Sequence, residues 1–307
     1  MKLTIGMADS IITINLLGQA KKIVDLCHIY FKGFLCPAQG GDAEVKVSIL
    51  NNLNNNSPVI KRGRKRVFEQ RLPTKDVMEW LSKFPGHIDD FPITERTISS
   101  FCQDGLLLFN PESSDGCIFL KDGPGCFRPV YRLFWMYLAQ VLGERKGCFV
   151  HSAALVRDGK GYIFLGDSGA GKSSLARLSE GINVFSDDSP VLCERDGDYL
   201  VFPSPFHQLD PSQSFNKNMI RLSARVEGFY FLIKDNQTYL EDISKRDAVS
   251  LIINRHILFF HYLSARARSY LFDLFLDACD KIPYYNLRFC LDKDIWEAID
   301  SSDRRIR

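Results

Sequence analysis

Residues 162–173 read Tyr-Ile-Phe-Leu-Gly-Asp-Ser-Gly-Ala-Gly-Lys-Ser, and they are the most informative stretch of the chain. From Gly166 onward the stretch matches the pattern G-x-x-x-x-G-K-[ST], which arises by chance in a chain of about 300 residues with a probability of about 1%. The four residues before the glycine predict a buried strand, and the residues from Lys172 predict a helix. A strand, a glycine loop and a helix in this order form the P-loop (Walker A) arrangement, which holds a phosphate chain.

The residue types in the loop match this chemistry. Glycines let the backbone bend so that successive N–H groups point inward at phosphates, and the start of the helix adds its positive dipole end. The Lys172 ammonium is expected to reach β- and γ-phosphate oxygens, and the Ser173 hydroxyl is expected to take one position on Mg²⁺. The expected nucleotide-binding residues are Gly166, Asp167, Ser168, Gly169, Ala170, Gly171, Lys172, Ser173 and Ser174.

An acidic pair follows the next predicted strand. Gly181 is a helix stop signal, residues 182–185 predict a strand, and Asp187 and Asp188 come directly after it. A strand–helix–strand crossover makes the two strands parallel, so the pair is expected at the same sheet edge as the glycine loop. One carboxylate would hold Mg²⁺ and the other would accept a proton from an attacking hydroxyl. An ordinary surface turn is the alternative for this pair.

His151 is placed by counting along a predicted hairpin. Residues 148–156 and 161–165 predict two strands, and Asp158-Gly159 between them is a strong two-residue turn signal. This register puts His151 opposite Gly166, where it is expected to contact a phosphate or to orient a carboxylate. The alternative is a histidine that only fills the strand edge, and a one-residue slip would turn the ring to the other face.

Composition narrows the class of protein. The chain has 307 residues, 45% of them hydrophobic, and a net charge of +2, which excludes whole-chain disorder, collagen and coiled coil. The nine cysteines are odd in number and form no CxxC pair, and the N-terminus lacks a signal peptide, so we expect reduced thiols in the cytoplasm. The longest apolar stretches, 130–142 and 251–263, are shorter than the roughly 20 residues of a membrane span and predict buried helices, so no membrane partner is expected.

The predicted fold class is α/β with mixed α+β character. We expect an N-terminal α+β region over residues 1–102, with recognition of the substrate or a partner as its expected role, and a P-loop catalytic domain with a mixed central sheet over residues 103–307. Residues 51–66 predict a flexible loop that ends in the basic run Lys-Arg-Gly-Arg-Lys-Arg. This run is either a surface loop or a contact to nucleic acid or an acidic peptide. Nucleic acid is the weaker expectation because no aromatic residues are interleaved with the charges. Strands are expected at 2–15, 44–50, 106–109 and 117–120, and a helix at 18–33.

The stretch from His151 through Asp188 resembles the catalytic domain of HPr kinase/phosphorylase, whose fold is related to phosphoenolpyruvate carboxykinase. More closely, it is similar to the HPr-kinase-related proteins that include peptide-tailoring kinases. The resemblance continues at residues 202–206 (FPSPF), 283–289 (PYYNLRF) and 294–297 (DIWE), and it covers roughly residues 103–301. It implies a carboxykinase-like domain that uses ATP and Mg²⁺.

The resemblance also implies roles for individual residues. Lys172 and Ser173 would take the triphosphate and Mg²⁺, Asp187 would be the base, Asp188 the second metal ligand, and His151 a phosphate-side partner. The sequence PSPFHQLD stands where HPr kinases carry a glycine-containing signature, which argues against the reverse phosphorylase reaction and against HPr as substrate.

The expected function is therefore that of a cytoplasmic ATP-dependent kinase. Its acceptor would be a hydroxyl, foremost a serine in a protein or peptide, with Phe206, His207 and Arg221 as candidates on the acceptor side. One alternative is a nucleotide-gated module that binds a peptide or partner with little or no turnover. Another is a kinase of a free small molecule such as serine. The sequence identifies neither the phosphoryl acceptor nor the oligomeric state, and a homo-oligomer is one of the alternatives.

Overall fold

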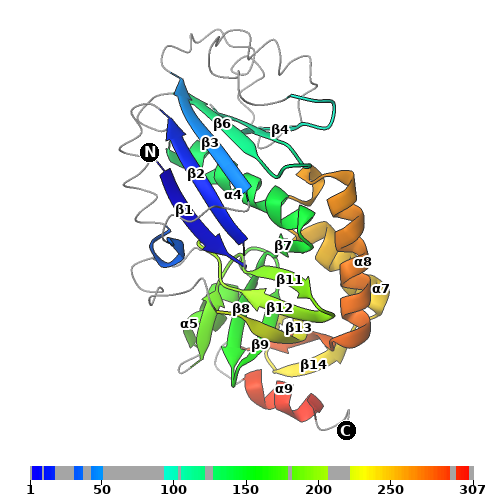
Figure 1. Ribbon diagram of the computed structural model, residues 1–307. Coiled ribbons are helices and arrows are strands. Elements are labelled where there is room, and N and C mark those ends of the chain that lie inside the picture. The colour runs from blue at the N-terminus through cyan, green and yellow to red at the C-terminus, as the bar shows by residue number, and fades with distance from the viewer. Residues whose placement is uncertain are drawn as a thin grey trace, which may run out of the picture. The chain divides into compact units, whose positions relative to one another are not determined.

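The computed structural model describes residues 2–8, 10–17, 31–36, 43–50, 93–102, 105–121, 127–178, 182–206, 222–290 and 295–303. The chain forms two compact units: unit 1 comprises Met1–Arg145 with His261–Ala267, and unit 2 comprises Lys146–Phe260 with Arg268–Arg307. Each unit has its own sheet of parallel and antiparallel strands, which confirms the predicted mixed α+β class (Figure 1). The boundary expected after residue 102 falls between two paired strands, whereas the compact units divide after Arg145.

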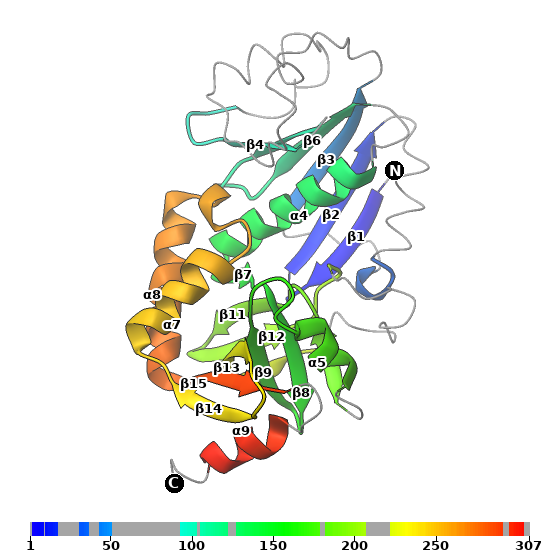
Figure 2. The same cartoon turned by 180° about the vertical axis from the view of Figure 1, so that it is seen from behind.

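Unit 1 is a six-stranded sheet in the order β1-β2-β3-β6-β5-β4. The helix α4 (Phe127–Glu144) lies across one face of it (Figure 2). Its residues Leu133, Phe134 and Tyr137 are buried. The single strand expected over 2–15 is wrong, because the chain turns at Ala8 (φ 47°) and forms a hairpin. The strands are β1 (Lys2–Met7), β2 (Ser10–Leu17), β3 (Ala43–Leu50), β4 (Ile98–Cys102), β5 (Gly105–Phe109) and β6 (Gly116–Lys121), and a short 3-10 helix, η1, spans Lys32–Phe34. The helix expected at 18–33 lies mostly outside the described residues, as does the loop 51–66.

Unit 2 is built on a nine-stranded sheet with the path β10-β8-β9-β13-β12-β11-β7, to which β15 and β14 add beside β13. Strand β13 runs parallel to both β9 and β15, so the carboxyl ends of these three strands lie at the same edge. The strands are β7 (Gly147–Phe149), β8 (Ser152–Arg157), β9 (Lys160–Leu165), β10 (Asn183–Ser186), β11 (Val191–Arg195), β12 (Asp198–Phe202), β13 (Ala224–Lys234), β14 (Tyr239–Asp242) and β15 (Tyr284–Phe289). The helices of this unit are α5 (Lys172–Leu178), α7 (Lys245–Leu251), the π-helix η3 (Ile252–His256), α8 (Ala265–Lys281) from Arg268 onward, and α9 (Ile295–Asp303). The 3-10 helix η4 (Phe260–Tyr262) begins at Phe260 of this unit and continues into the segment His261–Ala267 of unit 1.

An aromatic cluster supports β9, the strand that leads into the glycine loop. Its alternate residues Tyr162 and Phe164 meet Trp296 of α9 edge to face, with ring centroids 5.0 and 6.0 Å apart, and Phe164 stacks on Tyr230 of β13 at 5.4 Å. The Arg157 guanidinium lies 4.3 Å from the centre of the Trp296 ring. Leu175 and Ala176 of α5 bury into the same cluster, so the strand before the loop and the helix after it share one core.

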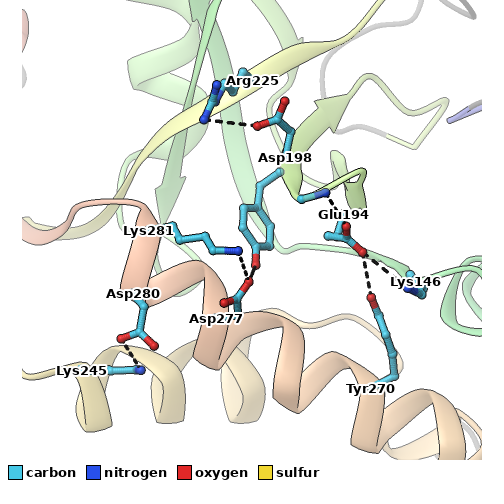
Figure 3. A network of polar contacts seen from close by, with 11 residues as sticks. Lys146, Glu194, Asp198, Arg225, Lys245, Tyr270, Asp277, Asp280 and Lys281 are labelled. Atoms are coloured by element: carbon cyan, nitrogen blue, oxygen red, sulfur yellow. Dashed lines mark hydrogen bonds and ion pairs between the residues drawn. The ribbon is translucent and has the colours of Figure 1, made fainter.

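Polar contacts attach α8 to the hairpin β11–β12 (Figure 3). The Tyr270 hydroxyl donates to Glu194 Oε2 at 3.1 Å, and two turns further along the helix Tyr199 donates to Asp277. Burial, together with the bond to Glu194, raises the pKa of Tyr270 to about 12, so this phenol stays a donor at neutral pH. These contacts fix the helix on the hairpin.

The apolar stretch 251–263 does not form the single buried helix that its composition predicts. It begins at the last residue of α7 and continues as the π-helix η3. Ile257 then pairs with Val150 in an isolated β-bridge, and the stretch ends in the 3-10 helix η4. Phe259 in between adopts a φ of 61°, a left-handed conformation that interrupts a helix. The other stretch, 130–142, is helical as predicted. Within the described ranges, none of the helices combines the length and apolarity needed to span a membrane.

Candidate functional site

The glycine loop joins β9 to α5 as the motif predicts. Asp158 and Gly159 take φ values of 54° and 76° in the turn of the β8–β9 hairpin, and Ser152 pairs with Leu165, which is the predicted register. In the loop itself, Gly169 and Gly171 have φ values of 82° and 110°. A Cβ on Gly166 would stand 2.7 Å from the Cβ of Ala170. The loop conformation therefore requires glycine at all three places.

Lys172 folds back onto the loop that precedes it. Its side chain is buried, with 6% of the residue exposed, and Nζ donates to the Gly166 carbonyl at 2.6 Å and to the Asp167 carbonyl at 3.2 Å. Burial lowers the pKa of Lys172, and the charges of Asp188, Asp167 and Asp187 oppose this shift. The Lys172 ammonium is thus partly desolvated and within the electrostatic reach of three carboxylates. Its N–H groups, which now bond to the loop carbonyls, could instead bond to an incoming anion.

The acidic pair Asp187 and Asp188 lies at the same sheet edge as the glycine loop, but the strand order that brings it there differs from the expected one. Strand β10 runs in the same direction as β9, as predicted, but the two are not neighbours, because β8 lies between them and pairs with both. Asp187 is 2% exposed. Asp188 is held by its backbone, since its carbonyl accepts from the Ser152 N–H at 3.0 Å. The Ser186 hydroxyl accepts from the N–H of Asp188 at 3.3 Å and from the N–H of Ser189 at 3.0 Å.

His151 directly precedes β8, one position beyond the pair of Ser152 with Leu165, and it is therefore beside Gly166. Its Nε2 lies 3.5 Å from Asp188 Oδ1. Burial lowers the pKa of His151 to about 4, and the charge of Lys172 lowers it further, against the effect of Asp167. The imidazole is therefore neutral at pH 7 and faces the carboxylate as an uncharged ring rather than as a cation.

Arg255 and His256, the last residues of η3, contact Asp167 and His151 of the site. Neither was among the predicted site residues. The His256 carbonyl accepts from the His151 N–H at 2.6 Å, and the two imidazole rings lie 6.3 Å apart. The Arg255 guanidinium donates to the Asp167 carboxylate at 3.2 Å. The only signal in the sequence is an Arg-His pair inside an apolar stretch, and nothing local indicates which distant loop it meets.

The residues suggested for the acceptor side have different outcomes. Phe206 is buried, packs edge to face on Phe149 at 5.5 Å between ring centroids, and its carbonyl accepts from the Ser189 hydroxyl at 2.5 Å. This is a core position that supports the turn after the acidic pair. His207 and Arg221 lie outside the described residues.

The sequence profile of one protein family, described as SynChlorMet cassette protein ScmC, matches residues 132–302, which is more than half of the chain. The chain belongs to the ScmC family. The matched segment contains the glycine loop, the acidic pair and the end of η3. No curated protein matches this ScmC chain.

A Mg²⁺ ion at this edge would need the phosphate oxygens of a nucleotide in addition to the protein's own side chains. Among the described residues, no group of three or more His, Cys, Asp or Glu side chains could hold a metal ion. Mg²⁺ is commonly bound by one or two protein ligands, with phosphate oxygens and waters completing the octahedron. Ser173 at the start of α5 and Asp188 after β10 are of the right chemistry for such a shared site.

The buried histidines predict a pH dependence of stability for the ScmC chain. Burial lowers the pKa of His256 to about 4, and within the described part of the chain its Nδ1 has no hydrogen-bond partner. The folded state then binds fewer protons than the unfolded state between pH 6.5 and 4, so stability is complete above pH 6.5 and falls as the pH drops through this window. The lowered pKa of His256 corresponds to a loss of about 3 kcal/mol in the free energy of unfolding across this pH window.

We expect the free energy of unfolding, measured by urea denaturation from pH 7.5 to 4.5, to fall less steeply in His256→Leu than in the wild type. His261→Gln is the control, because it removes an exposed histidine instead of a buried one. Parallel curves for the wild type and His256→Leu would contradict the assignment.

Proposed function

We propose that this chain is an ATP-dependent kinase that transfers the γ-phosphoryl group to a hydroxyl, foremost a serine of a protein or peptide. One observation carries the proposal. The buried Lys172 ammonium belongs to a complete G-x-x-x-x-G-K-[ST] motif and lies within the electrostatic reach of Asp187 and Asp188, which follow the strand β10 at the same sheet edge. A phosphate-binding loop with two carboxylates beside it contains the parts that phosphoryl transfer needs.

Each group has a distinct task in this proposal. Lys172 would exchange the loop carbonyls for β- and γ-phosphate oxygens and would neutralise the charge that develops on them. Ser173 and Asp188 would hold Mg²⁺, which when bound neutralises phosphate charge and aligns the phosphate tail. His151, with Nε2 at 3.5 Å from Asp188 Oδ1, would keep that carboxylate oriented.

Asp187 would accept the proton of the acceptor hydroxyl. In the proposed step a bond forms between the acceptor oxygen and the γ-phosphorus, and the bond from the γ-phosphorus to the β–γ bridging oxygen breaks. ADP leaves with the electron pair, and the hydroxyl proton goes to Asp187. The burial of this side chain favours the role, because a carboxylate removed from water interacts more strongly with a nearby proton donor.

The proposal includes a cytoplasmic location, where ATP is supplied. The described cysteines support it, since they carry thiols rather than disulfides, as is usual in a reducing compartment; they are Cys36, Cys117, Cys148, Cys193, Cys279 and Cys290.

The test is a phosphotransfer assay with the full chain. The protein is incubated with γ-labelled ATP and Mg²⁺, and separately with the product of a neighbouring gene, a serine-containing peptide derived from it, and free serine. We expect a phosphate adduct on the protein or peptide, located by mass spectrometry. An adduct on free serine alone would move the acceptor class to small molecules, and no adduct on any acceptor would overturn the kinase assignment.

A second candidate, a nucleotide-gated module that binds a peptide or partner, is favoured by unit 1. This unit has a sheet of its own that the P-loop site does not need. A binding module would show ATP-dependent partner affinity without phosphotransfer, and would keep that affinity when Asp187 is replaced.

A further inference from the structure

Arg255 lies on the π-helix η3, which continues α7. Single π turns are rare and occur frequently at functional sites. Backbone hydrogen bonds fix the end of this one: the His256 carbonyl accepts from the His151 N–H at 2.6 Å, and the Leu258 N–H donates to the Phe149 carbonyl at 3.0 Å. The backbone that carries Arg255 is therefore tied to the segment that enters β8, beside the glycine loop.

The side chain of Arg255 reaches the loop itself. Its Nη1 lies 3.2 Å from Asp167 Oδ2, and the two side chains are 59% and 70% exposed. Exposed ion pairs of this kind contribute little to stability and exchange partners readily. Asp167 also presents its backbone carbonyl to the Lys172 ammonium at 3.2 Å, so two cations meet at one loop residue from different elements.

We propose that Arg255 is a further nucleotide-contacting residue, which exchanges the Asp167 carboxylate for the terminal phosphates of a nucleoside di- or triphosphate. The inference rests on the proposed function in one respect, namely that the glycine loop binds a nucleotide. The planar guanidinium fork matches phosphate geometry and is the group of choice for paired hydrogen bonds to phosphate. Without nucleotide, the Asp167 carboxylate takes the place of the phosphates and holds the Arg255 guanidinium at the loop.

The position of the contact selects the outer phosphates. The lysine of a P-loop reaches the β- and γ-phosphates, and Asp167 adjoins that lysine. Arg255 would therefore contact the β- and γ-phosphates as well. Its contribution is expected to be largest for ATP, smaller for ADP and absent for AMP.

The chain offers a matched control for this contact. Arg225 and Asp198 form a second exposed pair in unit 2, also 3.2 Å apart and with 66% and 50% of the side chains exposed (Figure 3). Arg225 lies at the beginning of β13, where it pairs with Lys160 at the start of β9. This is the end of the strands opposite to the glycine loop.

The experiment measures nucleotide affinity by calorimetry for the wild type and for Arg255→Ala, Arg255→Lys, Asp167→Asn and Arg225→Ala. We expect Arg255→Ala to weaken ATP binding about 10- to 50-fold, as the loss of charge-assisted bonds implies. Arg255→Lys should recover part of the affinity. Asp167→Asn keeps the loop backbone and removes the competing carboxylate, so it should bind ATP more tightly than the wild type. Arg225→Ala should change nothing.

The outcomes separate this inference from the proposed function. If Arg255→Ala binds ATP within twofold of the wild type, or if Asp167→Asn weakens ATP binding as much as Arg255→Ala does, the pair is only structural and the inference is overturned while the kinase proposal stands. If the wild type binds ATP with the expected dependence on Arg255 but transfers no phosphate, the inference holds and the kinase proposal fails. Absence of nucleotide binding by the wild type overturns both.

Discussion

Replacing Asp187 by Asn is expected to reduce phosphotransfer by about 10²–10⁴-fold, the usual contribution of a general base. The substitution keeps the shape of the side chain and removes only the proton-accepting charge. Because the nucleotide is held by the loop and by Lys172, the affinity for ATP should stay within a few-fold of the wild-type value. Rates of transfer to the peptide and calorimetric affinities for ATP, measured on the same preparation, check both parts.

The matched variant is Asp198→Asn, which removes an exposed carboxylate of unit 2 and should leave the rate unchanged. Asp187 is buried, so thermal melting must show that Asp187→Asn is folded before its rate is compared. A folded Asp187→Asn variant that keeps the wild-type rate would contradict the role of this residue as base. Retained partner binding without any turnover in the wild type would instead favour the binding module.

The features that were predictable from the sequence are those that local chemistry determines. The Asp158-Gly159 turn follows from two residues that both tolerate positive φ, and its register then places His151 beside Gly166. The loop conformation follows from its glycines, at positions where a side chain would either clash or adopt a left-handed φ. In each case the decisive interaction lies within a few residues along the chain.

The features that were missed depend on pairing between distant segments. The sequence indicates that β9 and β10 run in the same direction, but not that β8 would lie between them, because β8 precedes both in the chain. The contact of Arg255 with Asp167 joins residues 88 positions apart. The turn at Ala8 carries alanine at its positive-φ position, where glycine or asparagine is the usual residue, so the strongest turn signal is missing from the first hairpin.

Replacing Lys172 by Ala is expected to lower the rate of phosphotransfer by about 10²–10³-fold, the loss seen when one preorganised donor to a developing charge is removed. Lys172→Met tests the same charge without leaving a cavity, because its unbranched side chain is of similar length. Both variants should also lose the rise in melting temperature that ATP produces in the wild type, since a ligand stabilises only the protein that binds it.

The stability of the ligand-free variants distinguishes a functional lysine from a structural one. Burial lowers the pKa of Lys172 despite three carboxylates whose charges oppose the shift, so the folded protein holds this ammonium at a cost. Lys172→Met should therefore melt at the same temperature as the wild type or higher in the absence of nucleotide. A lysine kept for the fold would show the opposite pattern, with a lower melting temperature and an unchanged rate per folded molecule. Loss of activity combined with unchanged or increased stability is the result expected of a group that is held in place for an anion.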